Sequence, residues 1–80
     1  MKITVKCFSH IKYALGKNKI IINLEAGADT ADLEQEIRGL AEGKLDGIKF
    51  VTALNQHYIK IPVELQEGDE VAFIPPVQGG

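Results

Sequence analysis

Apolar and polar residues alternate at the start of the chain, in the stretch KITVKCF (2–8). Every second residue from Ile3 to Cys7 is apolar, which is the pattern of a strand that buries one face. The β-branched run KIIINL (19–24) predicts a second strand. Between these strands, SHIKYALG has the spacing of one helical turn that stops at a glycine.

The segment between Asp29 and Gly43 has helical periodicity. Asp29 is a suitable N-cap, and Gly43 is a natural position for the chain to leave the helix. Apolar residues recur at i, i+4, i+7 and i+8 and form one stripe: Leu33, Ile37, Leu40 and Ala41. We expect Glu34 and Arg38 to pair on the solvated face. No feature of the sequence explains Gly39 inside this helix.

Three shorter strands are predicted after the helix, over 48–54, 57–61 and 70–74, and they are separated by polar turns. The element order is therefore β-β-α-β-β-β. This order predicts an α+β domain in residues 1–74, with a mixed sheet of about five strands and one main helix packed on one face. Residues 75–80 are expected to form a flexible tail.

Composition narrows the function classes. The formal net charge is −2, so the chain lacks the basic character of most nucleic-acid-binding domains. No apolar run has the length of a membrane span, and the N-terminus does not resemble a signal peptide. A single cysteine excludes an intrachain disulfide. We expect a cytoplasmic protein whose partners are proteins or small molecules.

Few side chains in the sequence are candidates for metal binding or catalysis. His10 and His57 lie in or beside predicted turns without a third ligand at metal spacing, so no metal site is predicted. Cys7 alternates with apolar residues and is expected to pack as a small hydrophobe, because no base accompanies it in the sequence.

The open side of the predicted sheet is a candidate partner-binding surface. Phe8 and Ile74 alternate onto the side opposite the expected core, with Lys6 and Thr4 beside them. Apolar side chains that cluster on an open sheet are typical of a protein-binding patch. The alternative is that loops cover these residues.

The C-terminal sequence FIPPVQGG is the second candidate. Two prolines cannot continue a ladder, so they end the last strand and direct the chain outward. Four further residues add at most about 14 Å of reach. The terminal glycines have no Cβ and can enter a narrow channel, which would leave the carboxylate of Gly80 open to an enzyme. The residues of this tail are Pro75, Pro76, Val77, Gln78, Gly79 and Gly80.

These features together resemble a known family. The β-β-α-β order with a diglycine end resembles the ubiquitin-like β-grasp sulfur carriers. More specifically, ALNQ (53–56) and GDEVAFIPPVQGG (68–80) resemble the MoaD-like family, the small sulfur-carrier subunits of molybdopterin synthase. The opening VKCFSHIKYALG is similar to the first strand and turn of that family, whereas the helix carries no specific motif.

The resemblance implies a cycle of sulfur transfer. An ATP-dependent, E1-like activating enzyme would adenylate the carboxylate of Gly80, and a sulfur donor would replace AMP to leave a thiocarboxylate. The loaded tail would enter the large catalytic subunit of molybdopterin synthase and deliver sulfur to a pterin precursor in molybdenum cofactor biosynthesis. Two carriers on a dimer of large subunits would form a heterotetramer. This chain would bind no cofactor and supply no catalytic side chain.

Three alternatives remain open at this point. A carrier of the same fold can serve thiazole synthesis for thiamine or the thiolation of tRNA. A ubiquitin-like modifier would use Gly80 to form isopeptide bonds with lysines. A β-grasp binding module would carry its diglycine by accident.

Overall fold

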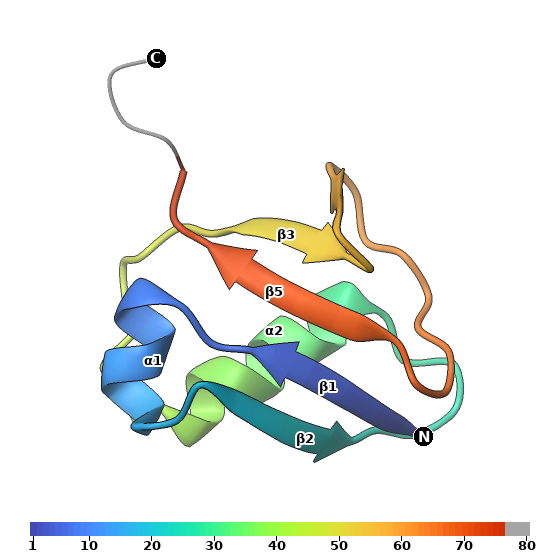
Figure 1. Ribbon diagram of the computed structural model, residues 1–80, viewed down its shortest axis with the longest axis horizontal. Helices are drawn as coiled ribbons and strands as arrows, with labels where there is room; N and C mark the ends of the chain where they lie inside the picture. Colours follow the sequence, from blue (N-terminus) through green and yellow to red (C-terminus); the bar gives the residue numbers. More distant parts are fainter. Residues whose placement is uncertain (77–80) are drawn as a thin grey trace.

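Five strands form one sheet in residues 1–76, the part of the chain that the computed structural model describes (Figure 1). The elements in chain order are β1 (Lys2–Lys6), α1 (Ser9–Leu15), β2 (Lys19–Asn23), α2 (Thr30–Leu40), β3 (Val51–Leu54), β4 (His57–Ile59) and β5 (Glu70–Ile74). The sheet order is β2-β1-β5-β3-β4. β1 and β5 are parallel and the other neighbours are antiparallel, which confirms the predicted mixed sheet.

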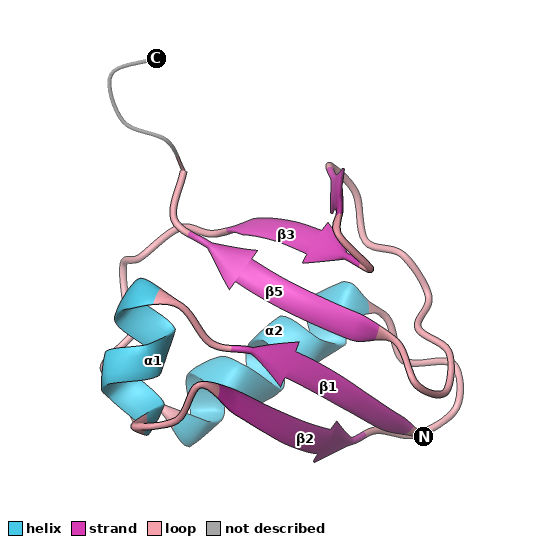
Figure 2. Cartoon of the chain, viewed as in Figure 1, coloured by secondary structure: helices cyan, strands magenta, loops and turns pink. Residues whose placement is uncertain are grey.

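Helix α2 lies across one face of the sheet (Figure 2). Alternate residues of the two central strands point toward it, so Ile3 and Val5 of β1 and Val71 and Phe73 of β5 are fully buried. The helix contributes buried apolar side chains at the predicted spacing: Leu33, Ile37 and, just after its last turn, Ala41. The predicted packing of one main helix on one face is confirmed.

A capping box begins helix α2. The Asp29 carboxylate accepts from the amide of Asp32, and the Asp32 carboxylate accepts from the amide of Asp29, both at 2.9 Å. The same end of the helix is tied to a distant segment, because Thr30 N donates to Val63 O and Val63 N donates to Thr30 Oγ1. These bonds hold the segment before β5 against the helix and let Leu65 enter the core.

The first strand and the turn after it differ from the prediction. β1 ends at Lys6 rather than Phe8, and α1 has seven residues rather than one turn. Phe8 occupies the N-cap position of α1 with an extended backbone, so it leaves the sheet as the chain turns into the helix. The predicted stop at Gly16 is confirmed, because this residue ends α1 in the left-handed conformation.

The end of helix α2 also differs. The helix stops at Leu40, three residues before the predicted stop at Gly43, and residues 41–47 continue as turns. The Leu40 side chain is 51% exposed, so its placement in the core stripe was wrong. Leu45 is fully buried instead, because the turns fold back over the helix end.

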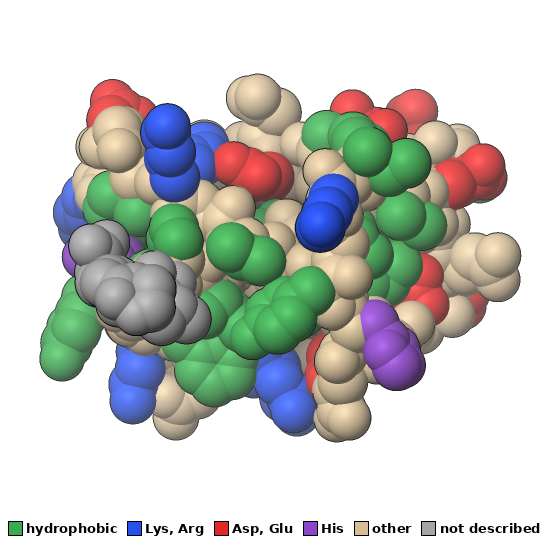
Figure 3. Space-filling view, turned by 90° about the horizontal axis from the view of Figure 1, so that it is seen from above, with side chains coloured by type: hydrophobic (Ala, Val, Ile, Leu, Met, Phe, Trp, Pro, Cys, Tyr) green, Lys and Arg blue, Asp and Glu red, His purple; other side chains and the backbone are tan. Residues whose placement is uncertain are grey.

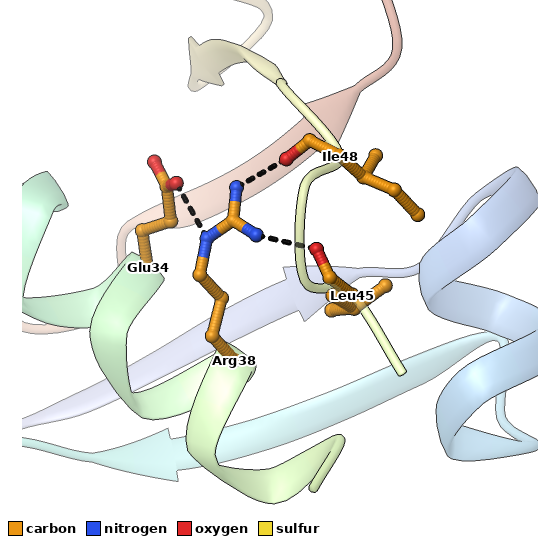
Figure 4. Close-up of polar contacts among 4 residues, drawn as sticks. All are labelled: Glu34, Arg38, Leu45 and Ile48. Carbon is orange, nitrogen blue, oxygen red and sulfur yellow. Dashed lines mark hydrogen bonds and ion pairs between the residues drawn. The ribbon is translucent and has the colours of Figure 1, made fainter. Parts of the chain in front are cut away.

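Arg38 connects the helix to these turns (Figure 4). Its Nε donates to Glu34 at 2.9 Å, as the predicted pair requires. The rest of the guanidinium binds the chain that follows: Nη1 donates to Leu45 O and Nη2 to Ile48 O. Its centre also lies 4.9 Å from the Phe50 ring centroid. Arg38 is therefore partly buried, rather than on a solvated face as predicted.

The contact with Arg38 accounts for the late start of β3. The third strand was predicted from residue 48 and begins at Val51. Because Ile48 O accepts from Arg38, it is engaged outside the sheet, and Phe50 packs tilted against Phe73 with ring centroids 6.2 Å apart. β4 is likewise shorter than predicted. It begins at His57, after a two-residue turn at Asn55 and Gln56, and ends at Ile59.

Gly39 provides a test of helix energetics. It is exposed in the last turns of α2, its φ is helical, and a Cβ there would meet no atom within 4 Å. We expect Gly39→Ala to stabilise the protein by about 1 kcal/mol, which raises the Tm by about 4–8 °C in a domain of this size. Thermal unfolding followed by circular dichroism measures the change.

The matched control is Gly68→Ala. A Cβ at this position also has free space, but Gly68 has a φ of +84°. The substitution should therefore destabilise the protein, because a side chain strains the left-handed region. A Gly39→Ala variant that melts at or below the parent temperature would contradict the expectation.

Candidate functional site

The face of the sheet opposite α2 carries a row of side chains that runs across four strands. The sheet register pairs Lys6 of β1 with Ala72 of β5, Ala72 with Ala53 of β3, and Ala53 with Tyr58 of β4. Paired residues point to the same side of a sheet. Residues from both ends of the chain and from its middle therefore meet on one surface.

This surface is hollowed around its apolar residues. A depression of about 220 Å³ is lined by Lys6, Phe8, Ala53, Gln56, Tyr58, Glu70, Ala72 and Ile74. Both aromatic side chains that line it are well exposed, Phe8 at 45% and Tyr58 at 70%. Figure 3 shows hydrophobic side chains gathered on the surface beside the end of the described chain. We call these eight residues the open-face hollow.

The open-face hollow brings together the three residues that the sequence placed in a partner-binding patch. Phe8, Ile74 and Lys6 all line it, although Phe8 reaches it from the N-cap of α1 rather than from a strand. Phe8 is exposed, so the alternative that loops cover it is wrong for this residue. Whether a partner binds here stays a prediction.

Sequence reasoning missed Tyr58 as a member of the surface. The signal was present: the turn at Asn55 and Gln56 makes β3 and β4 a hairpin, so a residue two beyond the turn faces the same side as its partner Ala53. Ala53 is nearly buried at 8% exposure and forms part of the floor.

An ion pair lies in the hollow. Lys6 Nζ lies 3.4 Å from Glu70 Oε1, and both side chains remain substantially exposed to solvent. Such a pair contributes at most about 1 kcal/mol to stability. The pair also gives the surface a mixed polar and apolar character. It places one positive and one negative charge beside an apolar surface, as in interfaces that form and release.

The chain leaves the sheet next to this hollow. β5 ends at Ile74, directly before Pro75 and Pro76, as the proline pair predicts. Figure 1 shows this segment leading away from the sheet. The other predicted tail residues, Val77, Gln78, Gly79 and Gly80, lie outside the described residues, so their threading role and the division into a domain and a tail stay predictions.

The remaining candidate groups are dispersed. His10 and His57 are exposed and lie on different elements, as predicted for surface residues. Within residues 1–76, no three histidine, cysteine or acidic side chains come together as they would around a metal ion. In the same part of the chain, no helix has the length and apolar character needed to cross a membrane.

Cys7 is buried in the core, and its thiol points back toward the strand. Its Sγ lies 3.8 Å from Val5 O. Burial raises the pKa of the Cys7 thiol, because desolvation disfavours the thiolate. The predicted packing as a small hydrophobe is confirmed.

Comparison with known proteins identifies the family of the chain. The sequence profile of the ThiS family matches residues 5–80. The chain is 39% identical to the molybdopterin synthase sulfur carrier subunit of Chlamydomonas reinhardtii, over the full length of both proteins.

Two solved structures are similar over almost the whole chain. The putative molybdopterin converting factor subunit 1 of Pyrococcus furiosus is 30% identical, with a TM-score of 0.85 over 95% of this chain and 98% of that one. The complex of subunits 1 and 2 of the molybdopterin-converting factor of Helicobacter pylori contains a chain that is 26% identical, with a TM-score of 0.71 over all of both chains.

The raised pKa of Cys7 gives a testable expectation. At pH 8 the native thiol stays protonated, so it should react with Ellman's reagent at least about 10-fold more slowly than in urea. Tyr13 is 86% exposed, so a Tyr13→Cys change in a Cys7→Ser background supplies the exposed reference. Equal reaction rates for Cys7 in the native and denatured protein would show that the thiol is accessible.

Proposed function

Because the chain belongs to the ThiS family and has the ubiquitin-like β-grasp fold, we propose that it is the sulfur carrier of molybdopterin synthase and bears the sulfur on Gly80. One observation carries this proposal: the 39% identity to a molybdopterin synthase sulfur carrier subunit extends over the full length of both chains. The family match also runs to the final residue and so includes the diglycine end.

The chemistry takes place on the terminal carboxylate. A carboxylate oxygen of Gly80 attacks the α-phosphorus of ATP on an E1-like activating enzyme, which releases pyrophosphate and leaves an acyl adenylate. A persulfide or sulfide donor then attacks the acyl carbon, and AMP departs with the electron pair of the broken bond. Sulfide gives the thiocarboxylate directly. A persulfide gives an acyl disulfide, which a thiol reductant cleaves to release the thiocarboxylate and leave a disulfide on the donor.

Sulfur delivery occurs in the large subunit. The thiocarboxylate sulfur bonds to an electrophilic carbon of the pterin precursor, while the electron pair of the bond that breaks there moves to a precursor oxygen, which takes up a proton. Water then cleaves the acyl–sulfur bond. The sulfur stays on the precursor and the carboxylate of Gly80 is restored. ATP belongs to the activating enzyme, so this chain itself binds no cofactor, and the cycle takes place in the cytoplasm, where ATP is supplied.

The described residues contribute the positioning of the carrier on its partner. The open-face hollow docks on the partner, and Pro75 and Pro76 direct the remaining chain into the partner's active site. Holding the reacting atom on a docked domain turns an encounter between two molecules into a local event. The acid and base groups then come from the partner enzymes.

The size of the hollow suits successive partners. The carrier must bind the activating enzyme, leave it, and bind the large subunit. A small apolar surface with an exposed ion pair between Lys6 and Glu70 favours an interface that releases, whereas a large apolar interface would be permanent.

Removal of Gly80 tests the proposed chemistry. We expect the shortened chain to fold normally and to form no molybdopterin when it is mixed with the large subunit, the activating enzyme, ATP and a sulfur donor. Molybdopterin is measured as its fluorescent oxidation product. Intact mass spectrometry of the full chain should show the increment of sulfur replacing oxygen at the C-terminus.

The two readouts separate the alternatives. A carrier for another pathway would gain the sulfur mass increment and form no molybdopterin. A ubiquitin-like modifier would instead appear as covalent adducts on denaturing gels of cell extract. Full molybdopterin formation by the shortened chain would exclude the proposal.

Substitutions in the hollow test docking. We expect Phe8→Ala and Ile74→Ala each to raise the Kd for the large subunit by about 10- to 100-fold, the effect of losing a central interface anchor. The Tm should change little for Phe8→Ala, because this side chain already contacts solvent. Isothermal calorimetry gives the Kd.

Tyr13→Ala is the matched control, because Tyr13 is an exposed aromatic residue on α1 that does not line the hollow. It should leave the Kd unchanged. A large loss of stability with unchanged binding in the Phe8 or Ile74 variant would assign these residues to the core.

A further inference from the structure

The sheet has an uncovered edge at β2. In the strand order β2-β1-β5-β3-β4, β2 has a neighbour on one side only. Figure 1 shows it as the outermost strand, on the border of the sheet remote from β3 and β4. β2 pairs with β1 along all five of its residues, so it is a regular strand without a bulge. Its sequence KIIIN contains no proline.

The hydrogen bonds of the β1–β2 ladder fix which backbone groups face outward. Leu24 N donates to Met1 O and Cys7 N donates to Asn18 O. In an antiparallel ladder hydrogen-bonded pairs alternate with non-bonded pairs, so Ile20 and Ile22 use their backbone groups toward β1.

Lys19, Ile21 and Asn23 therefore direct their amides and carbonyls away from the sheet. Within residues 1–76, these groups form no hydrogen bond to a loop, turn or side chain. The Ile21 side chain is also 53% exposed. Three regularly spaced outward donor and acceptor pairs are a ready template for another strand.

The polarity of the edge matches an antiparallel copy of itself. If two β2 strands meet with Ile21 opposite Ile21, Lys19 of each lies opposite Asn23 of the other. The same register, continued two residues beyond each strand end, brings Lys17 toward Glu25. The three outward residues of each strand then face one another as hydrogen-bonded pairs. Pairs of β-branched residues and of opposite charges stabilise such a ladder.

The charges around the two ends of β2 reinforce this match. Lys12 and Lys19 line a depression at the N-terminal end of the strand. Glu25, Asp32 and Glu36 line another at the C-terminal end. An antiparallel arrangement places the basic end of one copy beside the acidic end of the other, whereas a parallel arrangement would place like charges together.

We propose that β2 pairs antiparallel with β2 of a second copy, centred on Ile21, so that the two sheets become one. The interface is short and its charges are exposed, so the dimer is weak and sensitive to salt. It leaves the open-face hollow available, because β1 separates β2 from β5 and its neighbours. Each copy in the dimer thus keeps its hollow and the end of β5 accessible. The inference stands on the edge geometry and does not depend on the proposed function.

Sedimentation velocity over a concentration series tests the dimer. We expect the full chain to shift from monomer to dimer in the upper micromolar range at low salt, and to return toward monomer at about 0.5 M salt, where charges are screened within a few ångströms. A chain that stays monomeric at all concentrations at low salt would overturn the proposal.

A charge-swap series tests the register. Lys17→Glu or Glu25→Lys alone places like charges opposite each other and should weaken dimerisation at least about 5-fold. The double variant Lys17→Glu with Glu25→Lys restores opposite charges and should restore the dimer. A dimer that ignores the single changes, or that the double change fails to restore, would assign the contact to another surface.

Ile21→Pro tests the backbone pairing. Its missing amide is one that points outward, so the β1 ladder is retained and the circular dichroism spectrum should be unchanged. This variant should remain monomeric. Hydrogen exchange provides a reading in the parent chain: the amides of Lys19, Ile21 and Asn23 should exchange more slowly as protein concentration rises. Exchange that is independent of concentration under dimerising conditions would contradict the edge pairing.

Discussion

The parallel pairing of β1 with β5 is the constraint on which the rest of the structure depends. It sets Val5 beside Val71 and Lys6 beside Ala72, so the first and last strands become the centre of the sheet. Their inward residues form the middle of the core, and their outward residues form the middle of the open face. Because β5 runs in the same direction as β1, both strands end on the same side. Phe8, which follows the first strand, therefore meets Ile74, which closes the last.

The sheet separates stability from recognition by the alternation of its residues. Side chains toward α2 are buried and hold the fold, whereas those on the other side remain available. Phe73 and Ile74 show this division in adjacent positions: one is fully buried against Phe50 and the core, and the other lines the hollow. Side chains on the open face can therefore change with little effect on the stability of the fold.

The sequence predicted what local rules determine. The alternation around Val5 and Val71, the cap at Asp29 and the break after Ile74 all follow from neighbours within a few residues. The predictions were wrong where contacts between separate segments determine which residues are buried. Leu40 has the spacing of a core residue, but the following turns bring Leu45 into the core instead. For the site, the sequence predicted that Phe8, Ile74 and Lys6 share the open side of the sheet. The hairpin turn at Asn55 and Gln56 could have placed Tyr58 on the same side as Ala53, but the position of the hairpin beside β5 depends on a pairing between distant segments. Residues 77–80 of the tail lie outside the described residues, so their predicted role rests on sequence and family.

Arg38 has a consequence for how freely the protein can vary. It secures the stretch from Ala41 to Phe50 by binding the main-chain oxygens of Leu45 and Ile48, and main-chain oxygens are the same in every amino acid. These two bonds do not depend on the side chains at 45 and 48, although Ala41 and Leu45 are buried and the Phe50 ring contacts Arg38 and Phe73. Lys44 and Lys49 point to solvent and can be exchanged while the segment keeps its path, whereas Glu42 has a φ of 51°, a conformation that bulky side chains disfavour. A spectroscopic label attached at either lysine would leave the open-face hollow untouched.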